Sequence, residues 1–228
     1  MDVKTRTWEE TLKAAKGADL VLTDPPYGTT RNKWDTPPEL SDFFASAWTS
    51  LKPTGVIAFT TAEPFTSRAI LADKNFKYCW YWDKVLPTGH LNANRQPLRR
   101  VEPIPVFYRK QCTYNPIMGV DERGNRSWKR KNTSTGSYND YGEHTYESKG
   151  QKYPTTVLSV YQPPKGKRHP TEKPVELIKY LITTYTNKGD IVVDPFMGTG
   201  ATMKAAQELE RRFIGGDIHE EYISIALS

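Results

Sequence analysis

The amino-acid sequence predicts an α/β fold on three observations. Short apolar runs typical of buried parallel strands alternate with segments whose apolar residues follow the 3.6-residue period of a helix. Several of these runs end in loops rich in proline or glycine, as strands of an open sheet do. The alternation stops in a polar, basic middle region and resumes before the C-terminus. These observations indicate one layered sheet with an inserted region.

In the first part of the chain, the clearest strand is the apolar run at 18–23. It stops at Asp24-Pro25-Pro26-Tyr27-Gly28, and proline cannot donate to a strand ladder while glycine permits a turn. Phe43, Phe44, Ala47, Trp48 and Leu51 lie near the helical period. The expected elements are a helix at 8–16, a strand at 18–23, a helix at 38–51 that is broken at 53–55, a strand at 55–60 and a helix at 63–71.

The middle of the chain reads differently. We expect strands at 76–85 and 102–108, joined by a polar, basic segment at 87–100. Residues 121–152 have no usable period and are rich in Gly, Ser, Thr, Asn and Tyr, which is typical of loops or short hairpins.

The α/β pattern then resumes. A proline at the start favours a helix at 174–185. A strand at 190–193, a helix at 201–210, a strand at 212–215 that ends near Asp217 and a helix at 220–227 complete the prediction.

The length of the chain and the distribution of its charges indicate its domain organisation. We expect the 228 residues to form one principal domain, 1–228, with an inserted region at about 86–168. Residues 84–168 contain 16 of the 32 Lys and Arg residues but only 6 of the 26 acidic ones. This asymmetry favours a surface that faces a polyanion, although a merely solvated loop region is the simpler alternative.

Several classes of protein are disfavoured. No stretch approaches the roughly 18 apolar residues of a membrane span, and the first residues lack the apolar run of a secretory signal. The two cysteines, Cys79 and Cys112, suggest neither a disulfide framework nor a zinc site. No cluster of His, Cys and carboxylates indicates a metal. We expect a cytoplasmic protein.

The first motif is Asp194-Pro195-Phe196-Met197-Gly198-Thr199-Gly200, between a predicted strand and a predicted helix. Glycines there let a ligand approach the backbone and the free N–H groups of a helix start. An ordinary tight turn is the alternative. Met203 stands where the dinucleotide fingerprint needs a third glycine, and no phosphate-loop lysine follows. Asp217, after the next strand, suits the hydroxyls of a ribose; its alternative is an N-cap of the last helix.

The second motif is Asp24-Pro25-Pro26-Tyr27, for which a rigid turn is the alternative reading. Here the sequence resembles the DNA amino-methyltransferases, whose catalytic motif is Asp-Pro-Pro-Tyr and whose cofactor loop is Asp-Pro-Phe-x-Gly-x-Gly. A third match is His169-Pro170-Thr171-Glu172-Lys173-Pro174. The catalytic motif comes first and the cofactor loop last, a permuted order that resembles the β class. The stretches 28–35 and 78–108 also look like compact members from bacteria and their phages.

The resemblance implies a Rossmann-like fold that binds S-adenosylmethionine, with a target-recognition region between the motifs. It implies transfer of a methyl group to a flipped base in double-stranded DNA, in a bacterial cell or a phage-infected host, and a homodimer is plausible. The implied catalytic residues are Asp24, Pro25, Pro26 and Tyr27. The implied cofactor residues are Asp194, Pro195, Phe196, Gly198, Thr199, Gly200, Asp217, His169, Thr171, Lys173 and Asp24.

The chemistry of an aromatic amine explains the second motif. Its nitrogen is a poor nucleophile because the lone pair is delocalised into the ring. A carboxylate and a backbone carbonyl that accept both N–H hydrogens draw the nitrogen toward tetrahedral geometry and free the lone pair. Asp24 and the Pro25 carbonyl fit this role, held by adjacent prolines, and Tyr27 is expected to stack on the extruded base.

Two alternative functions remain open, and the sequence differs from the family pattern at one place. Asp rather than Ser before Pro-Pro-Tyr favours adenine N6 over cytosine N4 as the target amine, and a DNA-binding relative without catalysis is the second alternative. The family's Gly-Asp near the N-terminus, which helps to bind the cofactor adenine, is replaced by Lys4-Thr5-Arg6-Thr7. Phe196 is then a candidate for stacking or for the core.

Basic residues interleaved with aromatics suit nucleic acid. The candidate DNA ligands are Lys33, Arg95, Arg99, Arg100, Lys129, Arg130 and Lys131.

Overall fold

The computed structural model describes residues 1–30, 32, 35–131, 143–161 and 173–228. The chain divides into two compact units. The first unit contains Met1–Asn115 and Thr156–Ser228, and the second contains Pro116–Thr155.

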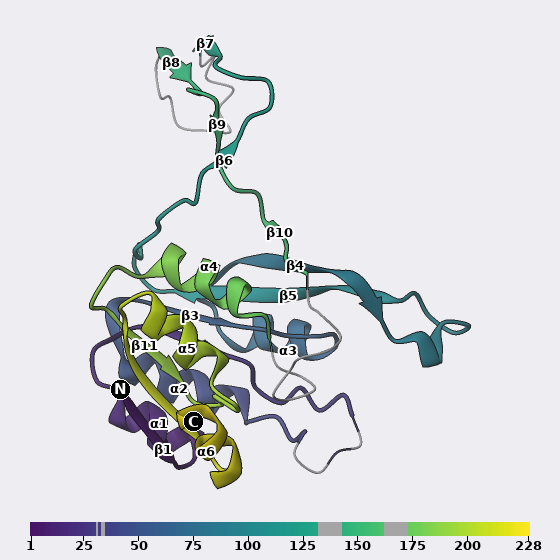
Figure 1. The fold of residues 1–228 in the computed structure, drawn as a ribbon, viewed down its shortest axis with the longest axis vertical. Helices are drawn as coiled ribbons and strands as arrows, with labels where there is room; N and C mark the ends of the chain where they lie inside the picture. Colours follow the sequence, from purple (N-terminus) through teal and green to yellow (C-terminus); the bar gives the residue numbers. More distant parts are fainter. Residues whose placement is uncertain (31, 33–34, 132–142, 162–172) are drawn as a thin grey trace. The chain divides into compact units, whose positions relative to one another are not determined.

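The first unit is built on a mixed sheet, which among the described residues has eight strands in the order β1-β12-β11-β2-β3-β5-β4-β10 (Figure 1). The first five in this order run parallel, β5 is antiparallel to both β3 and β4, and β10 is parallel to β4. The bounds of the strands are β1 (Asp2–Thr5), β2 (Ala18–Thr23), β3 (Leu51–Phe59), β4 (Phe76–Thr88), β5 (Arg99–Tyr108), β10 (Val157–Ser159), β11 (Ile191–Asp194) and β12 (Arg212–Asp217).

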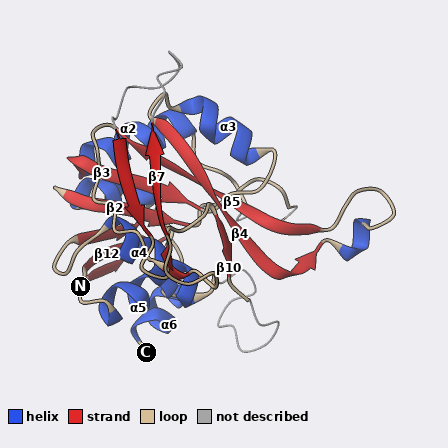
Figure 2. Ribbon diagram, turned by 90° about the horizontal axis from the view of Figure 1, so that it is seen from above, coloured by secondary structure: helices blue, strands red, loops and turns tan. Residues whose placement is uncertain are grey.

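Helices cover both faces of this sheet, so the expected α/β layering is confirmed. The helices are α1 (Trp8–Ala14), α2 (Leu40–Ser50), α3 (Phe65–Ala72), α4 (Val175–Tyr185), α5 (Ala201–Glu208) and α6 (Glu220–Leu227), with a short 3-10 helix, η1 (His90–Asn92). Figure 2 shows the sheet between α2 and α3 on one side and α4, α5 and α6 on the other.

The central strands are apolar on both faces because each face is covered. Leu20 and Leu22 of β2 belong to the core under α4 and α5, whereas Val21 between them packs with the core of α1, α2 and α3. This double burial explains why the strand at 18–23 reads as a continuous apolar run, and its predicted bounds are those of β2.

The position of Pro53 departs from the prediction. The helix expected at 38–51 ends at Ser50, and β3 already begins at Leu51, so Pro53 lies inside a strand that we expected to start at 55. Pairing between β2 and β3 is irregular between Ala18 and Leu20. Pro53 therefore occupies a stretch where a missing N–H donor is tolerated.

The antiparallel pair β4–β5 is longer than expected. The predicted strands at 76–85 and 102–108 extend to Thr88 and back to Arg99, and Pro87 lies where the register shifts between Asp83 and Thr88. The end of this hairpin projects from the sheet (Figures 1 and 2).

Two short strands were not predicted. β10 arises inside the polar region, and β1 forms an edge strand beside β12. Each has only three or four residues, too few for a period to be recognised.

The second unit contains two short antiparallel pairs, as the prediction of loops or short hairpins allowed. The pairs are β6 (Gly119–Val120) with β9 (Gln151–Lys152), and β7 (Ser127–Lys131) with β8 (Glu143–Glu147). Asp121 is buried and forms ion pairs with Arg123 and Arg126 at 2.9 and 2.6 Å. The guanidinium of Arg126 lies 5.5 Å from the centre of the Trp128 ring.

Across the described ranges, no helix has the length and apolar character that crossing a membrane requires. The same ranges contain no group of three or more His, Cys, Asp and Glu side chains placed to hold a metal ion.

Candidate active site

The two motifs lie next to each other because they follow adjacent parallel strands. Asp24–Tyr27 follows β2 and Asp194–Gly200 begins at the end of β11, and these strands pair directly. From β11 the next strand along the chain, β12, lies on one side, and from β2 the next strand, β3, lies on the other. At such a change of direction an open sheet leaves a crevice for ligands beyond the carboxyl ends of its strands. The hydroxyl of Thr23 donates to Asp194 Oδ1 at 2.5 Å and ties the two strand ends together.

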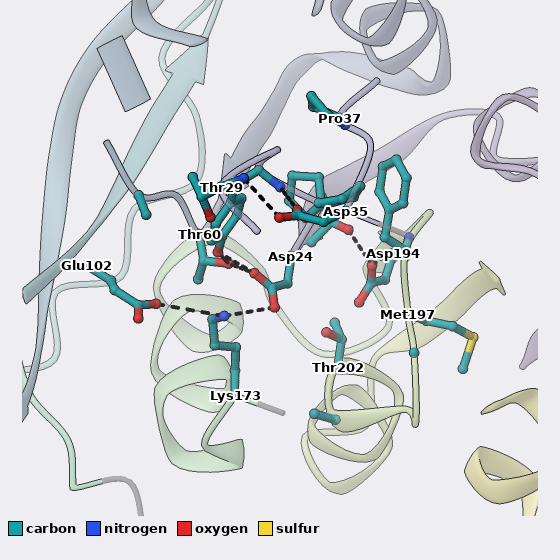
Figure 3. A pocket seen from close by; sticks show the side chains of 18 of the residues that line it. Asp24, Thr29, Asp35, Pro37, Thr60, Glu102, Lys173, Asp194, Met197 and Thr202 are labelled. Atoms are coloured by element: carbon teal, nitrogen blue, oxygen red, sulfur yellow. Dashed lines mark hydrogen bonds and ion pairs between the residues drawn. The ribbon is translucent and has the colours of Figure 1, made fainter. Parts of the chain in front are cut away.

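One cavity of about 990 Å³ adjoins both motifs, and it lies wholly within the first unit. All predicted residues of the two loops other than Gly200 line it, as do Asp217 and Lys173. The structure therefore brings the two candidate ligand sites into a single pocket (Figure 3).

The carboxylate of Asp24 is held from three sides. Its Oδ1 accepts hydrogen bonds from the hydroxyl of Tyr27 at 2.5 Å and from the hydroxyl of Thr60. Its Oδ2 accepts from Lys173 Nζ at 2.8 Å. The side chain remains 30% exposed to the cavity, so a ligand can still reach it.

Two of these partners come from distant parts of the chain. Thr60 follows β3, and Lys173 precedes α4. The resemblance assigns Lys173 to the cofactor, whereas the structure places its ammonium on Asp24 and 3.7 Å from Glu102 Oε2. Neither Thr60 nor Glu102 was singled out from the sequence, since nothing local marks them.

Tyr27 forms part of the wall of the pocket. Its ring stacks on Phe65 with centres 5.6 Å apart and planes 26° apart. Burial and the neighbouring carboxylate of Asp24 raise the pKa of Tyr27 well above its usual value, so the hydroxyl stays protonated and remains a donor. Tyr27 thus fixes the orientation of Asp24 in addition to presenting an aromatic surface.

Asp35 holds the loop after the catalytic motif. Its Oδ1 accepts the backbone N–H groups of Tyr27 and Gly28 at 2.8 and 2.9 Å. Its Oδ2 accepts those of Thr29 and Thr30 at 2.9 and 2.6 Å. Burial alone would raise the pKa of Asp35, but these donors outweigh burial and lower it. The carboxylate fixes the backbone that carries the second half of the motif.

Asp194 is a buried acid at the start of the glycine loop. The residue is 2% exposed, and Phe196 N donates to its Oδ1 at 3.1 Å. Burial raises the pKa of Asp194 to about 7, although hydrogen bonds from Thr202 and Thr23 oppose the shift.

This raised pKa predicts that Asp194 makes the stability depend on pH. The folded chain holds the proton up to about pH 7, whereas the unfolded chain releases it near the usual 3.8. The stabilising effect of the proton is complete below the lower value and is lost as pH rises through the upper one. The size of the pKa shift limits this loss in the free energy of unfolding to about 4 kcal/mol.

The matched comparison is Asp194→Asn, whose side-chain oxygen can still accept from Thr23 and Phe196 but does not titrate. We expect urea unfolding at a series of pH values to show the wild type losing stability relative to this variant between pH 4 and 7. Parallel stability curves for the two proteins would show that Asp194 does not titrate as described.

The glycine loop is open toward the pocket. Gly198 has φ +50°, and among the described residues no heavy atom lies within 4 Å of the position that a side chain at Gly198 would first occupy. Gly200, with φ +89°, is the N-cap of α5, and a methyl group there would lie 2.8 Å from Ala226 Cβ. Glycine is therefore required at position 200 for conformation and for packing against α6.

Asp217 closes this loop from the neighbouring strand. Its Oδ2 accepts from Gly198 N at 3.0 Å and its Oδ1 from His219 N at 2.9 Å. The N-cap of α6 is His219, so the alternative reading of Asp217 as that cap is wrong. Each carboxylate oxygen keeps a lone pair for a ligand hydroxyl.

An aromatic wall stands beside the glycine loop. The half-buried ring of Phe196 stacks against Trp8 with centres 6.4 Å apart and planes 26° apart, and it also contacts Phe43. Trp8 and Phe196 both line the cavity, so the ring of Phe196 packs against the core and also borders the pocket. Arg6, in the segment expected to replace the family's Gly-Asp, pairs with Asp2 at 3.2 Å.

The candidate DNA ligands are found in both units. Arg95 and Arg99 are exposed on the β4–β5 hairpin, and Arg99 lines the cavity. Arg100 is engaged by Asp83, with Nε and Nη2 donating at 2.7 and 2.9 Å. Lys129 is exposed in the second unit. Lys33, His169 and Thr171, and the side chains of Arg130 and Lys131, lie outside the described residues.

The fold and the shared pocket place the chain in the class of α/β enzymes whose ligands bind beyond the carboxyl ends of parallel strands. A family model described as DNA methylase (N6_N4_Mtase) matches residues 18–228. The chain therefore belongs to this family of DNA amino-methyltransferases.

Three similar proteins illustrate the family. The chain is 28% identical over 235 residues to the DNA adenine methyltransferase YhdJ of Escherichia coli K12, covering 93% of this chain and 76% of YhdJ. The crystal structure of the M1.HpyAVI–SAM complex is 26% identical, with a TM-score of 0.66 over 99% of this chain and 98% of the other. The cytosine-N4-specific PvuII DNA methyltransferase, 17% identical with a TM-score of 0.66 over 99% and 84% of the two chains, shares the fold. The chain spans 16% to 66% of the length of the first four curated relatives that it matches.

Proposed function

We propose that this chain transfers a methyl group from S-adenosylmethionine to the N6 amine of a flipped adenine in double-stranded DNA. The observation that carries the proposal is the single cavity into which both Asp24–Tyr27 and Asp194–Gly200 open. Relatives named as a DNA adenine methyltransferase and as a SAM complex support the substrate and the cofactor.

The residues around the glycine loop fit the cofactor. The open backbone at Gly198 gives a close approach, and Asp217 keeps acceptor capacity for ribose hydroxyls. The rings of Trp8 and Phe196 offer an apolar surface for the adenine. The acidic side chains of Asp24 and Asp217 line the same pocket, which suits a cation. When bound, the cofactor supplies a sulfonium methyl as the electrophile.

The protein's part in the reaction is to prepare the amine. Asp24 accepts one N–H of the target, and the carbonyl of Pro25, which lines the same cavity, is the acceptor for the other. With both hydrogens held, the nitrogen lone pair turns out of the ring and toward the methyl carbon. One proton must leave the methylated amine, and the Asp24 carboxylate is the acceptor in contact with it.

The experiment that tests the proposal is identification of the product. Purified protein is incubated with unmethylated double-stranded DNA and S-adenosylmethionine, and the DNA is digested for nucleoside mass spectrometry. We expect N6-methyladenine. N4-methylcytosine as the product would overturn the adenine assignment, and no methylated nucleoside would overturn the proposed activity.

The basic region at 86–168 is proposed to bind the DNA, and the projecting β4–β5 hairpin brings Arg99 to the cavity. We expect Arg99→Ala to weaken DNA binding and to reduce the slope of log K against log salt by about 0.9, the contribution of one neutralised phosphate.

The matched control for Arg99→Ala is Arg212→Ala, which removes the same charge from an exposed position at the opposite end of a strand from the cavity. Binding titrations at several salt concentrations compare the two. Equal slopes for Arg99→Ala and the wild type would remove Arg99 from the interface.

A further inference from the structure

Four charged side chains form a row along one side of the cavity. Lys173 Nζ lies 2.8 Å from Asp24 Oδ2 and 3.7 Å from Glu102 Oε2. Lys84 Nζ continues the row, 3.0 Å from Glu102 Oε1. Figure 3 shows the nitrogen of Lys173 between the carboxylates of Asp24 and Glu102.

Three members of this row are largely buried, although all four line the cavity. The side chains of Lys84, Lys173 and Glu102 are only 5%, 10% and 20% exposed. Burial alone would lower the pKa of Lys173, but the carboxylates of Asp24 and Glu102 outweigh burial and raise it, so the ammonium keeps its charge. Buried ion pairs seldom add stability over apolar packing, which suggests that the row has another role.

One atom in the row has no hydrogen-bond partner. Glu102 Oε2 is buried yet accepts no hydrogen bond from any described residue, while Oε1 of the same carboxylate is held by Lys84. A buried acceptor without a donor needs an explanation. Glu102 lines the cavity, and its Oε2 lies 3.7 Å from the Lys173 ammonium that is paired with Asp24, so its carboxylate lies beside the place of a ligand held by Asp24.

The order of these groups matches the edge of a base. Adenine presents the N6 donor, then the N1 acceptor, then the apolar C2–H; cytosine presents the N4 donor, then the N3 acceptor, then the O2 acceptor. The row presents an acceptor at Asp24, a donor at Lys173 and an acceptor at Glu102. The acceptor at Asp24 and the donor at Lys173 are complementary to both bases. The acceptor at Glu102 would face the O2 acceptor of cytosine, which it repels, or the C2–H of adenine, which it does not repel.

We propose that Glu102 is the residue that selects adenine over cytosine, because its Oε2 meets the third position of the base edge and repels a carbonyl oxygen there. The inference rests on the proposed function, since it assumes that the amine is held by Asp24. Lys84 fixes Oε1, and with it the direction in which Oε2 faces.

The testing variant is Glu102→Gln. Lys84 has only donors, so it retains the side-chain oxygen of the new residue, and the amide N–H₂ occupies the place of Oε2. The acceptor in the row becomes a donor, which suits cytosine O2. We expect the cytosine-to-adenine ratio of methylation rates to rise at least about tenfold, because discrimination against an unpaired buried polar group is lost.

The modification site of the wild type is mapped first. The substrates are then two duplexes that contain this site, one with the target adenine and one with cytosine in its place. Mass spectrometry gives the initial rates of N6-methyladenine and N4-methylcytosine formation. The matched control is Glu63→Gln, which changes the same group at another position lining the cavity and should leave the ratio unchanged.

A second, double variant tests the same inference if Glu102→Gln fails to fold. Lys84→Met with Glu102→Ala removes the buried pair together, and the ratio should rise less than in Glu102→Gln because the repulsion is gone but no donor is added. Melting and cofactor titrations establish that each variant folds. An unchanged ratio in folded variants that still methylate adenine would overturn the role of Glu102 alone. A wild type that produces no N6-methyladenine would overturn the proposed function and this inference with it.

Discussion

Replacing Asp24 by Ala is expected to reduce methyl transfer to DNA by about a thousandfold, the scale on which one preorganised transition-state contact contributes. The lost carboxylate leaves the target amine with one acceptor, and its lone pair stays delocalised into the ring. Tyr27, Thr60 and Lys173 also lose the carboxylate to which they all donate. The measurement is the single-turnover rate of transfer from labelled S-adenosylmethionine to DNA.

Two controls make this result specific to Asp24. Asp24→Asn retains one acceptor oxygen in the same position and should recover part of the rate. Glu63→Ala removes another carboxylate that lines the cavity and should leave the rate near that of the wild type. Cofactor affinity and melting temperature are measured for each variant. An Asp24→Ala enzyme that transfers as fast as the wild type would show that the amine is activated elsewhere.

The second large effect is expected at Asp35, a positioning residue without contact to the reacting atoms. Asp35→Ala removes the acceptor of four backbone N–H groups, from Tyr27 to Thr30. We expect kcat to fall by about a hundredfold, since a displacement of about 1 Å at a reacting centre has this effect. Unsatisfied donors should also lower the free energy of unfolding by about 2–4 kcal/mol.

The hydrogen-bond pattern distinguishes positioning from a general loss of stability. Asp35→Asn offers one oxygen and an N–H₂ group to four donors, so it should be nearly as impaired as Asp35→Ala. Asp42→Ala, at an exposed position in the first turn of α2, should have little effect. The affinity for cofactor should change little in all three, because Asp35 contacts the catalytic loop. A kcat unchanged in both Asp35 variants would show that this loop does not depend on the carboxylate.

Much of this site follows from local sequence because its main parts are strand ends. The apolar run of β2 and the Asp-Pro-Pro-Tyr that ends it specify a buried strand and a stiff loop within ten residues. The glycine loop is similarly local, since Gly200 needs a positive φ at the start of α5. Such features depend on neighbours in the chain and on backbone sterics, which the residue types reveal.

The remaining parts depend on the order of strands. Thr60 meets Asp24 because β3 pairs with β2, and Glu102 joins them because β5 pairs with β3. Lys173 reaches Asp24 from 149 residues away in the sequence. No periodicity reveals these contacts, because they arise when parallel and antiparallel neighbours bring their ends to one edge of the sheet.

One cavity is proposed to hold the methyl donor and the target amine together. The most direct measurement is a crystal structure of the protein with a non-reactive cofactor analogue and a short duplex that contains its site. We predict the analogue between Gly198 and Asp217, and an extruded adenine with its amine at Asp24 and the Pro25 carbonyl. An analogue bound outside this cavity, or a target base that remains stacked in the duplex while the cavity stays closed to it, would contradict the proposed function.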